Sequence, residues 1–241
     1  MTQLNNIILF LDIETVPQYA DYSELPEEWK ALWDYKAAYL VRNKEEETVE
    51  SIYNRAGIYA EFGKIICISC AYVLESSKGR TLHLKSFYGD DEKEILQKFC
   101  KMLVQWDEKG NKSLCAHNGR EFDFPYLCRR MIIHNIPLPL TLNIRGKKPW
   151  EVNHIDTMDL WRFGDFKAYT SLNLLSQTLG LPSPKDDING SRVWEVYWRE
   201  KNLERIVTYC QKDVITLAQV YLRLCGEELI KEENIEIKQE P

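Results

Sequence analysis

The feature that most constrains this chain is a short apolar run that ends in two carboxylates. Residues Ile7 to Leu11 are all apolar. The run is too short for a comfortable helix and is bounded by polar residues, so it predicts a buried β-strand. The sequence continues Asp12-Ile13-Glu14, and alternate residues of a strand point to the same side, so Asp12 and Glu14 share a face. Burial and mutual repulsion both disfavour two ionised carboxylates, and a divalent cation is the simplest group that would offset this cost.

The composition indicates a globular chain of one domain with insertions. Its 241 residues are 44% hydrophobic, and no stretch approaches the roughly 20 apolar residues of a membrane span. No basic segment precedes the first strand, which argues against a signal peptide. The odd number of scattered cysteines then favours reduced thiols and a cytoplasmic location. The net charge of −6 argues against strong non-specific adhesion to nucleic acid, but a carboxylate-lined metal site is itself acidic.

Cys67 and Cys70 have the spacing of a zinc or redox motif, yet they fall inside an apolar segment, 64–74, that reads as a strand. Residues three apart on a strand face opposite sides, and no second pair completes a zinc site. We therefore predict that both thiols are structural.

The order of the remaining elements predicts an α/β fold. Strands are expected at 64–75 and 80–88 with a turn at 76–79, at 113–116 and within 154–160, and helices from 91, over 122–134, after Ser171, and over 202–225. This order is typical of a three-layer domain around a mixed central sheet, which we expect to span residues 1–226. Residues 227–241 are mostly charged and are predicted to be a fraying tail.

Residues 18–62 form a long insertion after the first strand. Trp29, Trp33 and Leu40 recur at helical spacing behind Pro26, and a second helix is suggested around Ile52. One interpretation is a helical hairpin that packs its apolar stripe on the core. The other is a lid beside the active site, or a docking arm for a replication or repair partner.

Two further stretches add acids to the pair on the first strand. Asp123 stands at a predicted helix start, behind the turn-forming Asn118-Gly119. Tyr209 and Asp213 lie four residues apart on the last helix and therefore project from the same face. The chain thus carries four acids and one phenol on three separate elements.

Together these motifs closely resemble the proofreading-type 3′–5′ exonucleases of the DEDD superfamily, which have four acidic ligands and a ribonuclease H-like fold. Asp12-Ile13-Glu14 resembles the first motif, Asn118 through Phe122-Asp123 the second, and Tyr209 followed by Asp213 the third. The tyrosine is typical of the tyrosine subclass. The form of the second motif is most similar to the exonuclease domain of family B DNA polymerases and to free-standing predicted exonucleases related to it, which segment 179–193 also resembles. The resemblance covers roughly residues 5–225.

The resemblance implies metal-dependent hydrolysis of phosphodiester bonds at the single-stranded 3′ end of DNA or RNA, with DNA favoured. It implies that Asp12 bridges two divalent ions, that Glu14 and Asp213 complete one metal site, and that Asp123 holds the other ion. Mg²⁺ or Mn²⁺ suits such oxygen ligands, and a pair of ions suits in-line phosphodiester hydrolysis. Tyr209 would orient the attacking water as a hydrogen-bond partner, because a phenol with a pKa near 10 is a poor base.

Five further residues are candidate substrate contacts: Thr15, Asn118, Phe122, Lys147 and Lys148. Asn118 either contacts the terminal nucleotide or bonds the backbone of its turn, and Phe122 is either a core residue or a base-stacking wedge. The loop 145–150 combines cations with Trp150, as single-strand binding sites do, although an exposed charged loop has the same composition.

Two residues close to the motifs are predicted to be structural. His117 precedes the second motif, but a lone histidine is usually a satisfied structural residue. Asp156 follows a strand-like stretch, and we expect it to cap or brace the turn at Thr157 rather than to act as a fifth ligand.

Two other functions compete with the exonuclease interpretation. A phosphatase of the haloacid-dehalogenase type also begins with a strand that ends in an acid, but its second acid is an aspartate where this chain has Glu14, and Tyr209 would go unexplained. A catalytically inactive nucleic-acid-binding or scaffolding module of the same fold is the other alternative. Decay to such a module should remove ligands, and all four acids are present.

Overall fold

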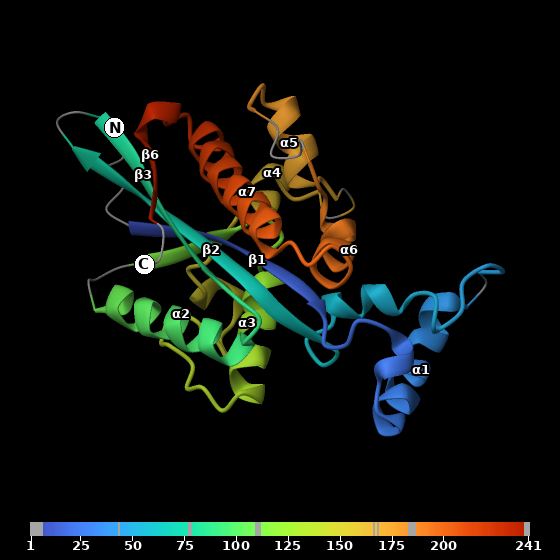
Figure 1. Ribbon diagram of the computed structural model, residues 1–241. Helices are drawn as coiled ribbons and strands as arrows, with labels where there is room; N and C mark the ends of the chain where they lie inside the picture. Colours follow the sequence, from blue (N-terminus) through green and yellow to red (C-terminus); the bar gives the residue numbers. More distant parts are fainter. Residues whose placement is uncertain are drawn as a thin grey trace.

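The computed structural model describes residues 7–42, 44–76, 79–108, 112–165, 167, 169–182 and 187–238, and it contains one sheet between two layers of helices (Figure 1). The strands are β1 (Ile7–Pro17), β2 (Gly63–Ser76), β3 (Gly79–Tyr88), β4 (Lys112–Ala116), β5 (Ile155–Asp156) and β6 (Ile235–Lys238). Their order is β5-β4-β1-β2-β3-β6. The pairs β1–β2 and β2–β3 are antiparallel and the others parallel, so the predicted mixed α/β sheet is confirmed.

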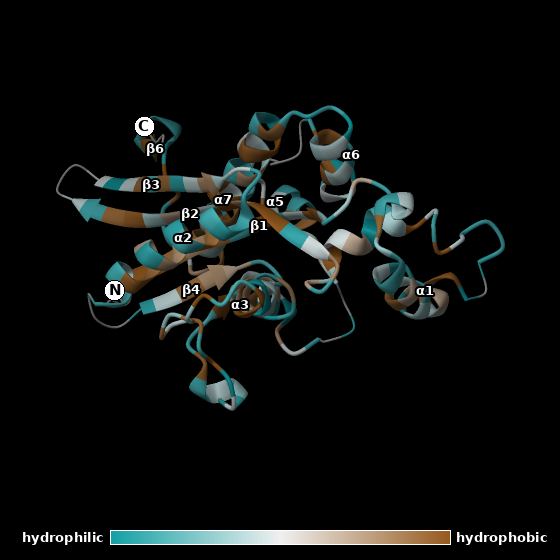
Figure 2. Ribbon diagram, turned by 60° about the horizontal axis from the view of Figure 1, so that its bottom comes forward, coloured by the Kyte–Doolittle hydropathy of each residue, from teal (hydrophilic) through white to brown (hydrophobic). Residues whose placement is uncertain are grey.

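The helices divide between the two faces of the sheet. One face carries α2 (Glu92–Asp107) and α3 (Asp123–Ile133), and the other carries α7 (Leu203–Leu224) with α4 (Thr157–Arg162), α5 (Leu172–Thr178) and α6 (Val193–Trp198) (Figure 1). Along β1, Leu9, Leu11 and Ile13 enter the core cluster under α2 and α3, whereas Ile8 and Phe10 enter the cluster under α7. In Figure 2 the apolar residues of the strands are brown, and the strands lie between the helices of the two layers. The alternation therefore turns Asp12 toward the face that α7 covers.

Three helices start where the sequence predicted, after Asp91, Ser171 and Asn202. The side chains of Asp91, Ser171 and Asn202 accept hydrogen bonds from backbone N–H groups in the first turns of α2, α5 and α7. The helices α4 and α6 were not predicted from the sequence. Each has six residues, which is too short for a helical period to show.

The insertion after β1 carries α1 (Glu27–Val41) and projects from one end of the sheet (Figure 1). The expected second helix is wrong, since Tyr53–Ile58 is a 3₁₀ stretch. Packing of the apolar stripe on the main core is also wrong. Trp33 is fully buried in a separate cluster made by the insertion's own side chains, which are Leu25, Trp33, Ala37, Ile52, Tyr53, Ala56 and Phe62. The insertion, called the arm below, thus has a small core of its own.

Both ends of the arm are hydrogen-bonded to the rest of the domain. At its N-terminal end, Trp198 Nε1 donates to the Pro17 carbonyl at 3.1 Å and Trp194 Nε1 donates to the Ala20 carbonyl at 3.0 Å. At its C-terminal end, Tyr126 donates to the Gly57 carbonyl and Arg130 to the Ala60 carbonyl, each at 2.8 Å. The arm is consequently tied to α6 on one side of the sheet and to α3 on the other.

The expected fraying of the C-terminal tail is wrong as far as Lys238. Ile230 is buried, and the Gln219 side chain bonds both its N–H and its carbonyl. Beyond it, β6 pairs in parallel with β3, with Ile235 opposite Leu82. A few isoleucines among the charges are enough to dock the segment, because the edge of β3 offers unpaired backbone groups. Among the described residues, no helix is both long and apolar enough to cross a membrane.

Candidate active site

The first two acids lie in the middle of β1, where one of its edges becomes free. On the β2 side, Asp12 pairs with Ser69 and Glu14 with Cys67, and a β-bulge follows at Glu14/Thr15. On the other side, β4 pairs with β1 only as far as Phe10. The start of α3 enters the space beyond the end of β4, and Asp123 Oδ1 accepts a hydrogen bond from the Ile13 N–H at 3.2 Å. Asp123 is therefore held against the backbone between Asp12 and Glu14.

The other two site residues come from α7. Tyr209 and Asp213 lie one turn apart, and both are buried. Loss of hydration, then the charge of Asp213, then that of Asp123 raise the pKa of Asp12 well above its ordinary value. Loss of hydration, then Asp12 and Asp213, raise the pKa of Glu14. The structure thus brings the four predicted acids close enough to oppose one another's ionisation.

Asp123 is buried in the same environment, but two backbone hydrogen bonds offset part of the rise in its pKa. Burial raises its pKa to about 7, although bonds from its own N–H and that of Ile13 favour the charged form. Tyr209 completes the group. Burial and the charges of Glu14, Asp213 and Asp12 raise its pKa, and its side chain is hydrogen-bonded to Asp213. At neutral pH Tyr209 is therefore a protonated phenol among carboxylates.

The donor atoms fit a hard divalent cation. In the described part of the chain, Asp12, Glu14 and Asp123 form no ion pair with a lysine or an arginine. One oxygen each of Asp12 and Glu14 lies within 4.8 Å of the Cys210 sulfur and of each other, a grouping that could hold an ion. Buried carboxylates without a cationic partner are costly, and a bound cation would remove that cost.

Cys210 is the residue at the site that the sequence analysis missed. Its thiol donates to Asp12 Oδ2 at 3.4 Å and lies 3.5 Å from the Asp12 carbonyl oxygen. Burial raises its pKa, so it is a neutral donor that steadies the Asp12 carboxylate. The available signal was its place on the last helix, directly after Tyr209 and three residues before Asp213.

The loop that leads to Asp123 is braced by residues predicted to be structural. The Asp156 carboxylate accepts hydrogen bonds from the N–H groups of Asn118 and Arg120, at 2.9 and 3.1 Å, and caps α4 through Met158. The His117 ring bonds the Thr157 hydroxyl and the Thr170 carbonyl. Both structural predictions are confirmed.

The candidate substrate contacts fall into two groups. Asn118 has φ 61, and its side-chain oxygen is buried with no hydrogen-bond partner among the described residues. Thr15 is half-buried just beyond the bulge, and Phe122, also half-buried, lies 5.4 Å from the Tyr126 ring. Thr15 and Phe122 adjoin Glu14 and Asp123 in the sequence, and the Asn118 carbonyl accepts a hydrogen bond from the Phe122 N–H in the turn before Asp123.

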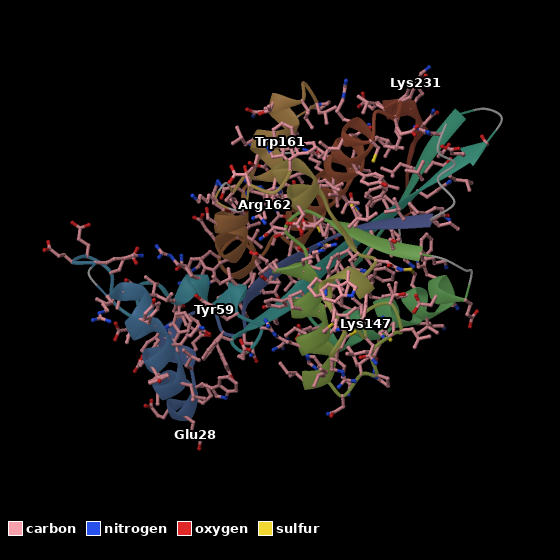
Figure 3. All side chains as sticks on the ribbon, turned by 180° about the vertical axis from the view of Figure 1, so that it is seen from behind. Glu28, Tyr59, Lys147, Trp161, Arg162 and Lys231 are labelled. Atoms are coloured by element: carbon pink, nitrogen blue, oxygen red, sulfur yellow. The ribbon has the colours of Figure 1, made fainter. Side chains whose placement is uncertain are left out.

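Lys147 and Lys148 form the second group. Both are exposed, and Lys148 lies over the Trp150 ring at 5.2 Å. Figure 3 places Lys147 on the side of the sheet that carries α3, away from Trp161 and Arg162. No contact in the described part of the chain joins either lysine to the acids.

A mixed six-stranded sheet between helical layers, with acids on its central strand, defines this domain as ribonuclease H-like. The family model described as a predicted 3′–5′ exonuclease related to the exonuclease domain of PolB matches residues 58–237. The match spans well over half of the chain, and the chain belongs to this family. Asp123, Tyr209 and Asp213 lie inside the matched range, whereas Asp12 and Glu14 precede it.

The chain is also similar to two curated DNA polymerases and, in its fold, to one solved structure. The chain is 27% identical over 133 residues to a DNA polymerase of Archaeoglobus fulgidus, covering 52% of the chain and 16% of the relative. It is 23% identical over 184 residues to a DNA polymerase of Pyrococcus glycovorans, covering 68% and 22%. The fold is similar to the family B DNA polymerase of Pyrobaculum calidifontis, with a TM-score of 0.54, 14% identity, and coverage of 90% and 24%. The chain therefore spans about a quarter or less of these polymerases.

Proposed function

We propose that this chain is a metal-dependent 3′–5′ exonuclease that hydrolyses phosphodiester bonds at the 3′ end of single-stranded nucleic acid. The observation that carries the proposal is the convergence of four acids and one phenol from β1, α3 and α7, with three of the acids having no cationic partner in the described residues. Membership of a family of predicted exonucleases supports the same reaction.

Asp12, Glu14, Asp213 and Asp123 would together hold two Mg²⁺ or Mn²⁺ ions. Such ions would supply an activated water and neutralise charge on the scissile phosphate. The protein's own contribution is to hold the ligands. The Ile13 N–H fixes Asp123, and the Cys210 thiol fixes Asp12.

Tyr209 positions the attacking water. Its raised pKa keeps the proton on the phenol, so the hydroxyl donates and accepts hydrogen bonds but does not act as a base. The unsatisfied Asn118 oxygen is suited to accept a hydrogen bond from the sugar of the terminal nucleotide. Thr15 and Phe122 would line the same end of the substrate.

DNA is the favoured substrate, because the relatives by sequence are DNA polymerases, and RNA is the alternative. The arm, which projects beside the catalytic end of the sheet, would then be the place where a replication or repair partner docks (Figure 1).

The test uses purified protein, Mn²⁺, and single-stranded DNA and RNA of matched sequence carrying a 5′ label. We expect progressive shortening from the 3′ end with release of mononucleotides. Asp213→Asn should lower the rate by at least about 10³-fold, while the metal-free variant still melts cooperatively as a folded protein, because one metal ligand is lost from an intact fold.

Glu204→Gln is the matched control, since Glu204 is exposed on α7, the helix that carries Asp213, and lies outside the acid group. If the wild-type protein leaves both DNA and RNA ends intact with Mn²⁺ and with Mg²⁺, the proposal fails, and an inactive nucleic-acid-binding module becomes the better interpretation.

A further inference from the structure

Two aromatic side chains beside the active site stand in solvent. Phe163 is 89% exposed and Tyr169 is 67% exposed, both in the segment between α4 and α5. Trp161, two residues before Phe163, instead packs against the cluster that contains Leu175. The segment can therefore bury an aromatic ring, and it leaves these two rings outside.

The backbone at Phe163 is also unusual. Phe163 ends α4 in the left-handed conformation, with φ 46 and ψ 33. A bulky L-residue is disfavoured there, where glycine or asparagine is the ordinary choice. A left-handed conformation and the exposure of a large apolar ring both cost free energy, which is a reason to look for a ligand.

The segment is anchored to the loop that leads to Asp123. At one end, Arg162 and Arg120 both bond the Asp159 carboxylate, at 3.0 and 3.2 Å. At the other end, the Thr170 carbonyl lies 2.8 Å from His117 Nε2. Figure 3 shows Arg162 and Trp161 on the helical layer that lies opposite Lys147. Phe163 and Tyr169 therefore belong to a segment that is bonded on both sides to the residues flanking Asn118, in the second motif.

The charge around these rings is less negative than that of the chain as a whole. Among the described residues, Arg120, Arg162 and Lys167 are balanced by Asp156, Asp159 and Asp165, in a chain whose net charge is −6. Arg120 keeps 43% of its side chain exposed despite its bond to Asp159. Exposed rings beside cations are the combination by which proteins hold single-stranded nucleic acid, with bases on the rings and phosphates on the cations.

We propose that Phe163 and Tyr169 form a stacking platform for the bases that precede the 3′-terminal nucleotides of a single strand, with Arg120 contacting a phosphate. The proposal deepens the exonuclease function and rests on it for the direction of the strand. It assigns the platform to the rim between α4 and α5 and separates it from the contacts of Thr15 and Asn118 with the last nucleotide.

The test measures binding and cleavage separately. Binding is followed by fluorescence anisotropy of a labelled 12-nucleotide DNA strand, and of its RNA counterpart, in Ca²⁺. Phe163→Ala and Tyr169→Ala should each weaken binding roughly 5- to 150-fold, as expected for the loss of one stacked base. Phe163→Trp should restore it. Tyr35→Ala is the matched control, because Tyr35 is 88% exposed on α1 and should leave binding unchanged.

Cleavage is measured with Mn²⁺ on the 12-nucleotide strand and on a dinucleotide too short to reach the platform. The ratio of kcat/KM for the long strand to that for the dinucleotide should fall in the double variant, through KM. If the double variant binds the strand as tightly as the wild type, the platform is overturned, whether or not the protein is a nuclease. If binding weakens but the wild type cleaves neither substrate, the platform stands and the exonuclease function fails.

Discussion

The buried Glu92 and the acids on β1 are partnered in opposite ways. Glu92 of α2 accepts hydrogen bonds from Arg130 Nε at 2.8 Å and Nη2 at 2.5 Å, from His134 at 2.7 Å, and from the Ile65 N–H at 2.7 Å. Across the sheet, Asp12 and Glu14 have other acids, a thiol and a phenol as neighbours. Glu92 is paired with an arginine, whereas the charged neighbours of the site acids are other acids.

The difference teaches how to tell a structural acid from a functional one. Burial is similar in the two places, since Glu92 is 5% exposed and Glu14 is 7% exposed. At Glu92 the protein supplies its own positive charge and thereby joins α2, α3, β2 and the arm. At Asp12 and Glu14 the described residues supply none, so a bound cation would remove the largest cost of ionising these carboxylates.

Breaking the structural pair should have the largest effect on stability. Arg130→Met leaves Glu92 buried without its partner, and we expect a loss of about 3–5 kcal/mol in the free energy of unfolding. The measurement is urea denaturation. The double variant Arg130→Met with Glu92→Gln should lose less than the single variant. Equal losses would mean that the pair acts through packing rather than charge.

The contribution of the site acids to folding stability should change with pH in the opposite direction from that of a salt-bridged acid. Burial raises the pKa of Asp123 from 3.8 to about 7, so the folded state favours the protonated form. In chelator-treated protein, stability should therefore be highest below about pH 4 as far as this group is concerned, and should decrease as the pH rises through 7, by up to about 4 kcal/mol. Thermal melts of the wild type and of Asp123→Asn across this range provide the check. The variant should show a flatter profile, and parallel profiles would contradict the expected cost of ionising Asp123.

Adding metal should reverse part of this loss. At neutral pH, Mn²⁺ at about 100 times its dissociation constant should stabilise the fold by about 2.7 kcal/mol, because it binds the native site and not the unfolded chain. Melting temperature in a Mn²⁺ titration is the readout. Asp213→Asn should reduce the shift, while Arg130→Met, although destabilised, should keep it. A melting temperature that does not change with either Mn²⁺ or Mg²⁺ would argue against a preformed metal site.

Several parts of the fold could be predicted because they depend on neighbours in the sequence. The alternation along β1 placed Asp12 on one face, and the helix starts at Asp91, Ser171 and Asn202 depend on side chains that bond N–H groups three residues on. The C-terminal tail was mispredicted because composition alone does not show that Gln219 will hold Ile230. The arm was mispredicted because an apolar stripe does not reveal which surface it will meet.

The sequence by itself determined the chemistry of the site and the spacing within each element. Asp12 and Glu14 share a face because a strand repeats every two residues, and Tyr209 and Asp213 share one because a helix repeats every 3.6. Only the tertiary structure decided that these faces meet. Asp123 bonds the backbone of a residue 110 positions away, and Cys210 bonds Asp12 across 198 positions. Such contacts depend on how strands and helices pack, which local periodicity does not encode. The same packing placed Arg130 beside Glu92 and, within the described part of the chain, gave Asp12 and Glu14 no such partner.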